Sequence, residues 1–129
     1  MAIEQEVTIN ASPSEVYDVL MNSEKFQTMT GGRETSISKE VGGSVSLFGG
    51  AIQARNVEIV PDQRIVQAWR ASDWPEGLYS IVNFELNKDG KNTKLQFRQS
   101  GHPDEATQHL KAGWHQMYWN PMNEMVKQS

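Results

Sequence analysis

The residue types in this sequence that are best suited to holding a small molecule are its aromatic and methionine side chains. The 129 residues include four tryptophans, four phenylalanines, three tyrosines and six methionines. Large aromatic side chains commonly line ligand clefts, and methionine is flexible and polarizable enough to contact apolar ligands of varied shape. We predict an apolar pocket in which tyrosine hydroxyls orient one polar group of the ligand; a packed hydrophobic core is the alternative for the same residues. The predicted lining consists of Met29, Phe48, Trp69, Tyr79, Phe84, Trp114, Met117 and Tyr118.

Arg70 could also do chemistry, because its planar guanidinium can bind the anionic group of a ligand. It directly follows Trp69, so on a strand the two side chains point to opposite faces. Asp73 and Glu76 come shortly afterwards. We favour a surface ion pair between Arg70 and one of these carboxylates, contributing less than about 1 kcal/mol to stability.

The histidines and cysteines give no pattern typical of a metal or cofactor site. His102, His109 and His115 are too widely spaced, because zinc motifs on helices need closer ligands and a third partner. There is no cysteine, which excludes disulfides, thiolate metal sites and cysteine nucleophiles. The glycine-rich phosphate loop and the G-x-S-x-G hydrolase motif are also absent. We therefore expect no metal and no cofactor.

The charge balance argues against nucleic acid or a membrane as a partner. Twelve Lys and Arg residues against sixteen Asp and Glu residues give a net charge of −4. Such a chain lacks the basic surface that duplex DNA or anionic lipid attracts. No apolar stretch approaches the roughly 20 residues that span a bilayer, and the acidic start of the chain does not resemble a secretory signal. We expect a soluble cytoplasmic protein.

The first third of the sequence predicts one strand and two short helices. Residues 3–9 alternate between apolar and polar side chains, as in a half-buried strand. Ser12 and Glu15 form a capping-box pattern that predicts a helix start, and a second short helix ends at Gly31-Gly32. Glycine and proline turns then separate five segments of strand length, namely 45–48, 52–60, 64–71, 79–86 and 93–99.

The end of the sequence predicts one long helix. Pro103 opens it, and apolar residues recur every three or four positions through Leu110, Trp114 and Met117 to Pro121. Because a proline inside a helix removes a hydrogen bond, we expect the helix either to kink at Pro121 or to end just before it. Helices gathered on one face of an antiparallel sheet form an α+β layout. A sheet that curls around the long helix can leave a pocket between the two.

Four motifs between residues 58 and 114 are specific enough to compare with known families. They are Glu58–Val66 (EIVPDQRIV), Trp69-Arg70, Trp74–Gly77 (WPEG) and Gly113-Trp114. These motifs resemble the family named after the activator of the 90-kDa heat-shock chaperone ATPase. The similarity is to the carboxy-terminal domain of that co-chaperone and to its small single-domain relatives, which lie in the START-like, birch-pollen-allergen-like superfamily. The segment at residues 7–17 (VTINASPSEVY) resembles the opening of that superfamily.

The resemblance implies a helix-grip fold in a single START-like domain over residues 1–129. In this fold a curved antiparallel sheet of about six or seven strands surrounds a long C-terminal helix, and two short helices follow the first strand. Members of the superfamily commonly enclose an apolar cavity. The resemblance therefore implies that the chain binds a hydrophobic small molecule between the sheet and the long helix.

The same resemblance leaves two further functions open. The family name implies a co-chaperone or protein-interaction domain that contacts the 90-kDa heat-shock chaperone in a stress response. Other members of the superfamily resemble polyketide cyclases, which implies a cyclase-like enzyme that needs acid–base groups within reach of its substrate. The candidates for those groups are Glu34, Tyr79, His115 and Tyr118.

Overall fold

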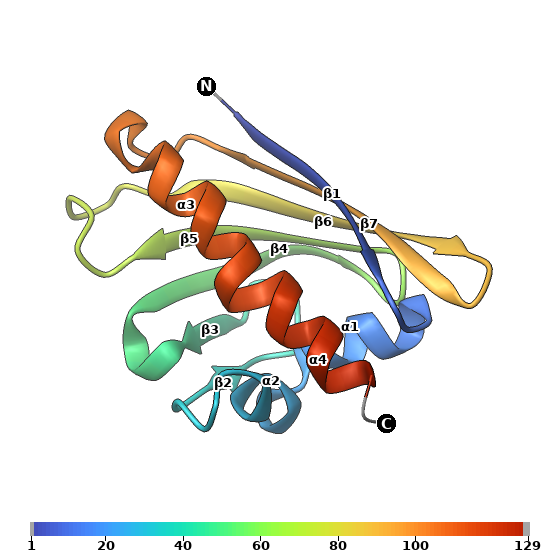
Figure 1. The fold of residues 1–129 in the computed structure, drawn as a ribbon. Coiled ribbons are helices and arrows are strands. Elements are labelled where there is room, and N and C mark those ends of the chain that lie inside the picture. Colours follow the sequence, from blue (N-terminus) through green and yellow to red (C-terminus); the bar gives the residue numbers. More distant parts are fainter. Residues whose placement is uncertain (1, 128–129) are drawn as a thin grey trace.

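The computed structural model describes residues 2–127, which form a seven-stranded sheet, two short helices and one long helical segment (Figure 1). The long helical segment consists of α3, a π-helical turn and α4. The first half of the chain holds β1 (Ile3–Ile9), α1 (Pro13–Met21), α2 (Ser23–Met29), β2 (Ser36–Ile37), β3 (Ser44–Leu47), a 3-10 turn (Phe48–Gly50) and β4 (Ile52–Val60). The second half holds β5 (Arg64–Ala71), β6 (Ser80–Asp89), β7 (Asn92–Ser100), a 3-10 turn (Asp104–Ala106), α3 (Thr107–Trp114), the π-helical turn (His115–Trp119) and α4 (Asn120–Lys127).

The sheet is antiparallel throughout, with the strand order β1-β7-β6-β5-β4-β3-β2. The predicted α+β class and antiparallel meander are confirmed. Asp89 pairs with Asn92 around Gly90, whose φ of 64° suits the tight turn expected there. The strand that the sequence pattern missed is β2, which has two residues and therefore no periodicity to detect.

One face of the sheet packs against the long helical segment, which crosses it diagonally (Figure 1). Alternate residues of β6 and β7, such as Phe84 and Phe97, are buried on this face, while their neighbours in the strands are more exposed. Both phenylalanine rings contact Trp114 and Trp119 of the helical segment. An antiparallel sheet that packs against a helix on one side has one apolar face and one solvent-exposed face, as observed here.

The two short helices begin at polar caps. The Ser12 hydroxyl accepts a hydrogen bond from the Glu15 backbone N–H at 3.3 Å, as the capping pattern predicts. The Glu15 carboxylate accepts a hydrogen bond from the Ser12 hydroxyl instead of the Ser12 backbone, so only half of the capping box forms. Asn22 ends α1 and caps α2, since its side-chain oxygen accepts from the Lys25 N–H at 3.0 Å.

The long helical segment does not end before Pro121. It passes through a π-helical turn at His115–Trp119 and continues as α4. A π-helical turn interrupts the regular i to i+4 hydrogen-bond ladder. Pro121, which has no N–H to donate, therefore stands directly after a point where that ladder is already broken. Within residues 2–127, we find no helix with the length and apolar character needed to cross a membrane.

Candidate functional site

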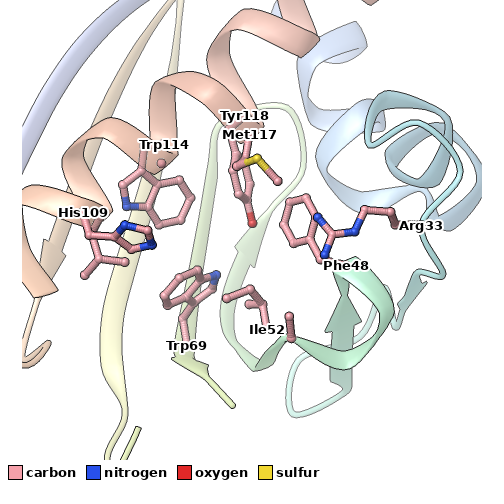
Figure 2. A pocket seen from close by; sticks show the side chains of 11 residues that line it. Arg33, Phe48, Ile52, Trp69, His109, Trp114, Met117 and Tyr118 are labelled. Atoms are coloured by element: carbon pink, nitrogen blue, oxygen red, sulfur yellow. The ribbon is translucent and has the colours of Figure 1, made fainter. Parts of the chain in front are cut away.

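A pocket with a volume of about 210 Å³ lies between the long helical segment and the end of the sheet where β4 begins and β5 ends (Figure 2). Its walls come from the 3-10 turn after β3, the two strand ends, α3 and the π-helical turn, with one side chain from the loop after α2. The lining consists of Arg33, Phe48, Ala51, Ile52, Trp69, His109, Leu110, Gly113, Trp114, Met117 and Tyr118.

Five of the eight residues predicted from the sequence line this pocket. They are Phe48, Trp69, Trp114, Met117 and Tyr118. Trp114 lies 5.1 Å from Trp69 and 4.4 Å from Tyr118 between ring centroids, and Phe48 lies 6.1 Å from Tyr118. Residues far apart in the sequence therefore form one aromatic surface, although ligand binding to it stays a prediction.

Three of the predicted lining residues lie outside the pocket. Phe84 belongs to the core behind it, where its ring stacks 6.2 Å from Tyr118. Met29 is buried at the end of α2 and does not reach the lining. Tyr79 is 50% exposed. Because Tyr79 precedes the inward-facing Ser80 directly, the period of a strand directs it away from the core.

Arg70 neither forms the expected ion pair nor reaches the pocket. Its guanidinium donates hydrogen bonds to the backbone carbonyls of Trp74 at 2.6 Å, Pro75 at 3.2 Å and Leu78 at 3.2 Å. It also lies 5.8 Å from the centre of the Tyr79 ring. Arg70 thus holds the loop between β5 and β6 through carbonyl oxygens. The sequence does not indicate this role, because the nearby carboxylates suggest an ion pair instead.

Phe48 enters the pocket from a backbone conformation that bulky residues rarely adopt. Its φ is 53°, and Gly49 and Gly50 follow with φ values of 67° and 94°. Left-handed backbone at a phenylalanine is a genuine outlier, and such strain gathers at ligand sites. The glycines at 49 and 50 predict only a turn between strands, but this turn also brings the Phe48 ring to within 5.7 Å of the Phe26 ring between centroids.

A buried chain of hydrogen bonds fixes the Trp114 wall of the pocket. The indole N–H of Trp114 donates to the Gln99 side-chain oxygen at 2.9 Å, and the Gln99 amide donates to the Ser80 hydroxyl at 3.0 Å. The Ser80 hydroxyl donates in turn to the Trp69 backbone carbonyl at 2.8 Å. Buried hydrogen-bond networks restrict side chains to one arrangement, so the Trp114 indole is held at a defined position relative to the Trp69 backbone.

Some lining residues were not predicted as site residues. Leu110 and Gly113 precede Trp114 by four and one residues, so the helical period could have indicated Leu110. Arg33 lies in a loop, so no helical or strand period indicates its position. A hydrogen bond from its backbone N–H to the Thr30 hydroxyl at 3.0 Å positions this loop. His109 and Arg33 lie on opposite sides of the pocket in Figure 2. The Arg33 guanidinium lies 5.2 Å from the centre of the Phe48 ring.

Only Tyr118 of the four acid–base candidates lies in the pocket. Glu34, His115 and Tyr79 are exposed at other places on the surface. Burial raises the pKa of the Tyr118 hydroxyl well above its ordinary value, so the group is neutral at physiological pH. A neutral phenol serves as a hydrogen-bond donor and acceptor.

A curved antiparallel sheet closed by one long helical segment, with an aromatic pocket between them, places this chain among proteins of the START-like, helix-grip class. The family described as "Activator of Hsp90 ATPase homolog 1-like protein" matches residues 10–127. The chain belongs to this family, and the resemblance noted in the sequence is confirmed.

Several named proteins are similar to this chain. The activator of 90 kDa heat shock protein ATPase homolog of Dictyostelium discoideum is 36% identical over 104 residues, covering 80% of this chain and 27% of that relative. The human homolog 1 is 26% identical over 117 residues, covering 91% of this chain and 34% of that relative. The chain thus spans about a quarter to a third of the length of these relatives.

Solved structures are similar over nearly the whole fold. The crystal structure of an HSP90 activator from Plasmodium falciparum superposes with a TM-score of 0.93 at 24% identity, covering 98% of this chain and 96% of that chain. The solution structure of the Aha1 dimer from Colwellia psychrerythraea has a TM-score of 0.81 at 18% identity, covering 97% and 96%. At these identities the likeness establishes the shared fold and leaves function to the site.

Proposed function

We propose that the chain binds a small, mostly apolar molecule in the pocket between the sheet and the long helical segment. The observation that carries this proposal is open space beside the aromatic wall of the pocket. A Cβ atom added at Gly113, which lines the pocket, would meet no atom within 4 Å. A cavity of about 150 Å³ in another protein holds benzene. The volume of about 210 Å³ here therefore suits a ligand of about two rings.

Gly113 supports the proposal because glycine is a costly residue in a helix. It lies inside α3 without the positive φ that would require glycine. A glycine in a helix interior destabilises the helix by about 0.5–1 kcal/mol relative to alanine. No packing contact accounts for its presence, since space is free on its Cβ side. Because Gly113 has no side chain, the wall of the pocket stays open at this position.

A titration of the labelled protein with 2-isopropylnaphthalene tests the proposed function. We expect saturating changes in amide chemical shifts that cluster at residues 48–52 and 109–118, because these segments line the pocket. Residues 85 and 96 on the opposite face of the sheet serve as an internal control. An absence of saturating shifts, or shifts spread evenly over the surface, would contradict binding in this pocket.

A second candidate is contact with the 90-kDa heat-shock chaperone, which the names of the relatives favour. The net charge of −4 complements a basic surface on such a partner. If this function applies, adding the purified chain should raise the rate of ATP hydrolysis by the chaperone. The control is the chaperone with its nucleotide site blocked. An unchanged rate at saturating concentrations would remove this candidate, while a cytoplasmic location and a role in stress response stay predictions.

A further inference from the structure

Trp69 carries a buried hydrogen-bond donor that no acceptor among the described residues meets at good geometry. The side chain is 3% exposed, and within residues 2–127 no oxygen accepts from its indole N–H at hydrogen-bonding geometry. Trp114 and Trp119 differ, because their N–H groups donate to Gln99 at 2.9 Å and to Gln5 at 2.7 Å. Leaving a buried donor unsatisfied is costly. The Trp69 N–H therefore lies beside the Tyr118 hydroxyl without a well-aligned acceptor.

Tyr118 stands beside this donor. In Figure 2 the Tyr118 oxygen and the Trp69 nitrogen both point toward the centre of the pocket. Burial is the larger cause of the raised pKa of Tyr118, and a hydrogen-bond interaction of the Trp69 side chain with the phenol acts in the opposite direction, so the two groups lie beside one another. A phenol whose oxygen accepts from the Trp69 N–H still has its own O–H to donate. The neutral phenol therefore keeps a proton that it can donate to a ligand.

We propose that Trp69 and Tyr118 form the polar end of the pocket and bind the carbonyl oxygen of an otherwise apolar, uncharged ligand of about two rings. This inference rests on the proposed function and specifies its ligand class. A carbonyl oxygen has two lone pairs, so it can accept from the indole N–H, the phenol O–H or both. The remaining lining residues around these groups are largely apolar and suit the ring system.

The surroundings of Tyr118 favour an uncharged acceptor over a carboxylate. The same burial that keeps the phenol protonated also penalises a buried anion. Arg33, the arginine of the lining, lies over the Phe48 ring and is exposed to solvent. Its charge is therefore hydrated and does not neutralise an anion placed between Trp69 and Tyr118.

Matched probes and variants test the inference. The probes are 2-acetylnaphthalene, its hydrocarbon counterpart 2-isopropylnaphthalene, and 2-naphthoate, each titrated into the wild type, Tyr118→Phe and Trp69→Phe. We expect each variant to weaken the ketone by about tenfold. The hydrocarbon should lose much less affinity than the ketone in each variant, so the ratio of ketone to hydrocarbon affinity should fall, and naphthoate should bind the wild type more weakly than the ketone. Tyr118→Phe removes a single oxygen, so it preserves the ring packing.

The possible results separate this inference from the function on which it rests. Binding of both neutral probes, with equal effects of each variant on ketone and hydrocarbon, would overturn the polar end and leave the apolar pocket in place. Naphthoate binding more tightly than the ketone would overturn the uncharged ligand class. If neither the hydrocarbon nor the ketone binds the wild type, the proposed function fails and the inference fails with it.

Discussion

Replacing Gly113 by leucine is expected to weaken binding of 2-isopropylnaphthalene by about ten- to a hundredfold. The leucine side chain would occupy open space on the pocket wall, and forcing a ligand into a filled core space costs about 1–3 kcal/mol. The free energy of unfolding should be unchanged or higher, because leucine is a better helix former than glycine. Loss of binding without loss of stability is the characteristic result.

The control for this substitution is the neighbouring position on the same helix. Ala112→Leu adds a leucine at an exposed site one residue away, where it does not line the pocket. We expect it to bind the probe like the wild type. Gly113→Ala should give intermediate binding and raise stability by about 0.5–1 kcal/mol. If Gly113→Leu lowered stability by more than about 1 kcal/mol, or if Ala112→Leu reduced binding equally, a pocket-filling effect would be contradicted.

Replacing Trp114 by alanine is expected to lower the free energy of unfolding by about 3–5 kcal/mol. Trp114 is almost fully buried and packs on Trp69, Phe97 and Tyr118 at centroid distances of 5.1, 4.2 and 4.4 Å. The substitution removes this packing and also leaves the Gln99 side-chain oxygen without its donor. The free energy of unfolding of a domain is typically only 5–15 kcal/mol, so this substitution removes a large part of it.

Urea unfolding followed by circular dichroism measures this effect. Trp114→Phe separates the two causes, because it retains most of the ring packing but not the hydrogen bond to Gln99. We expect Trp114→Phe to cost about 1–3 kcal/mol, the penalty of leaving a buried polar group unpaired. A loss below about 1 kcal/mol for Trp114→Ala would mean that the indole does not hold the helix to the sheet. Equal losses for the two variants would assign the effect to the hydrogen bond alone.

Patterns that repeat along the chain predicted most of the fold. The alternation of Leu95 and Phe97 with polar residues placed β7 and its inward face, because the two-residue period of a strand is visible in sequence. The spacing of Leu110 and Trp114 likewise predicted the helix and the face that packs on the sheet. Of the predicted residues that line the pocket, Trp69 and Trp114 lie on such elements, where the period fixes the side-chain direction, whereas Met117 and Tyr118 lie on the π-helical turn.

Residues placed by irregular backbone were not predictable in the same way. Arg33 lies in the loop after α2, where its backbone N–H donates to the Thr30 hydroxyl, and Tyr79 lies just before β6 with the Arg70 guanidinium 5.8 Å from the centre of its ring. Arg70 was assigned a carboxylate partner because its carbonyl partners leave no signal in residue types. The left-handed φ of Phe48 is also invisible in sequence, since glycine and not phenylalanine is the usual residue there.

The π-helical turn makes the length of the C-terminal segment as important as its composition. Met122 and Val126 of α4 are buried, as are Leu110 and Trp114 of α3, so both halves face the core across the irregular turn. Removing one residue from such a turn would rotate everything beyond it by about 100°, the advance of one residue in a helix with 3.6 residues per turn. The angular setting of the two halves is therefore determined by the number of residues in the turn, and a shortened descendant of this chain would have to rebuild the contacts between α4 and the core.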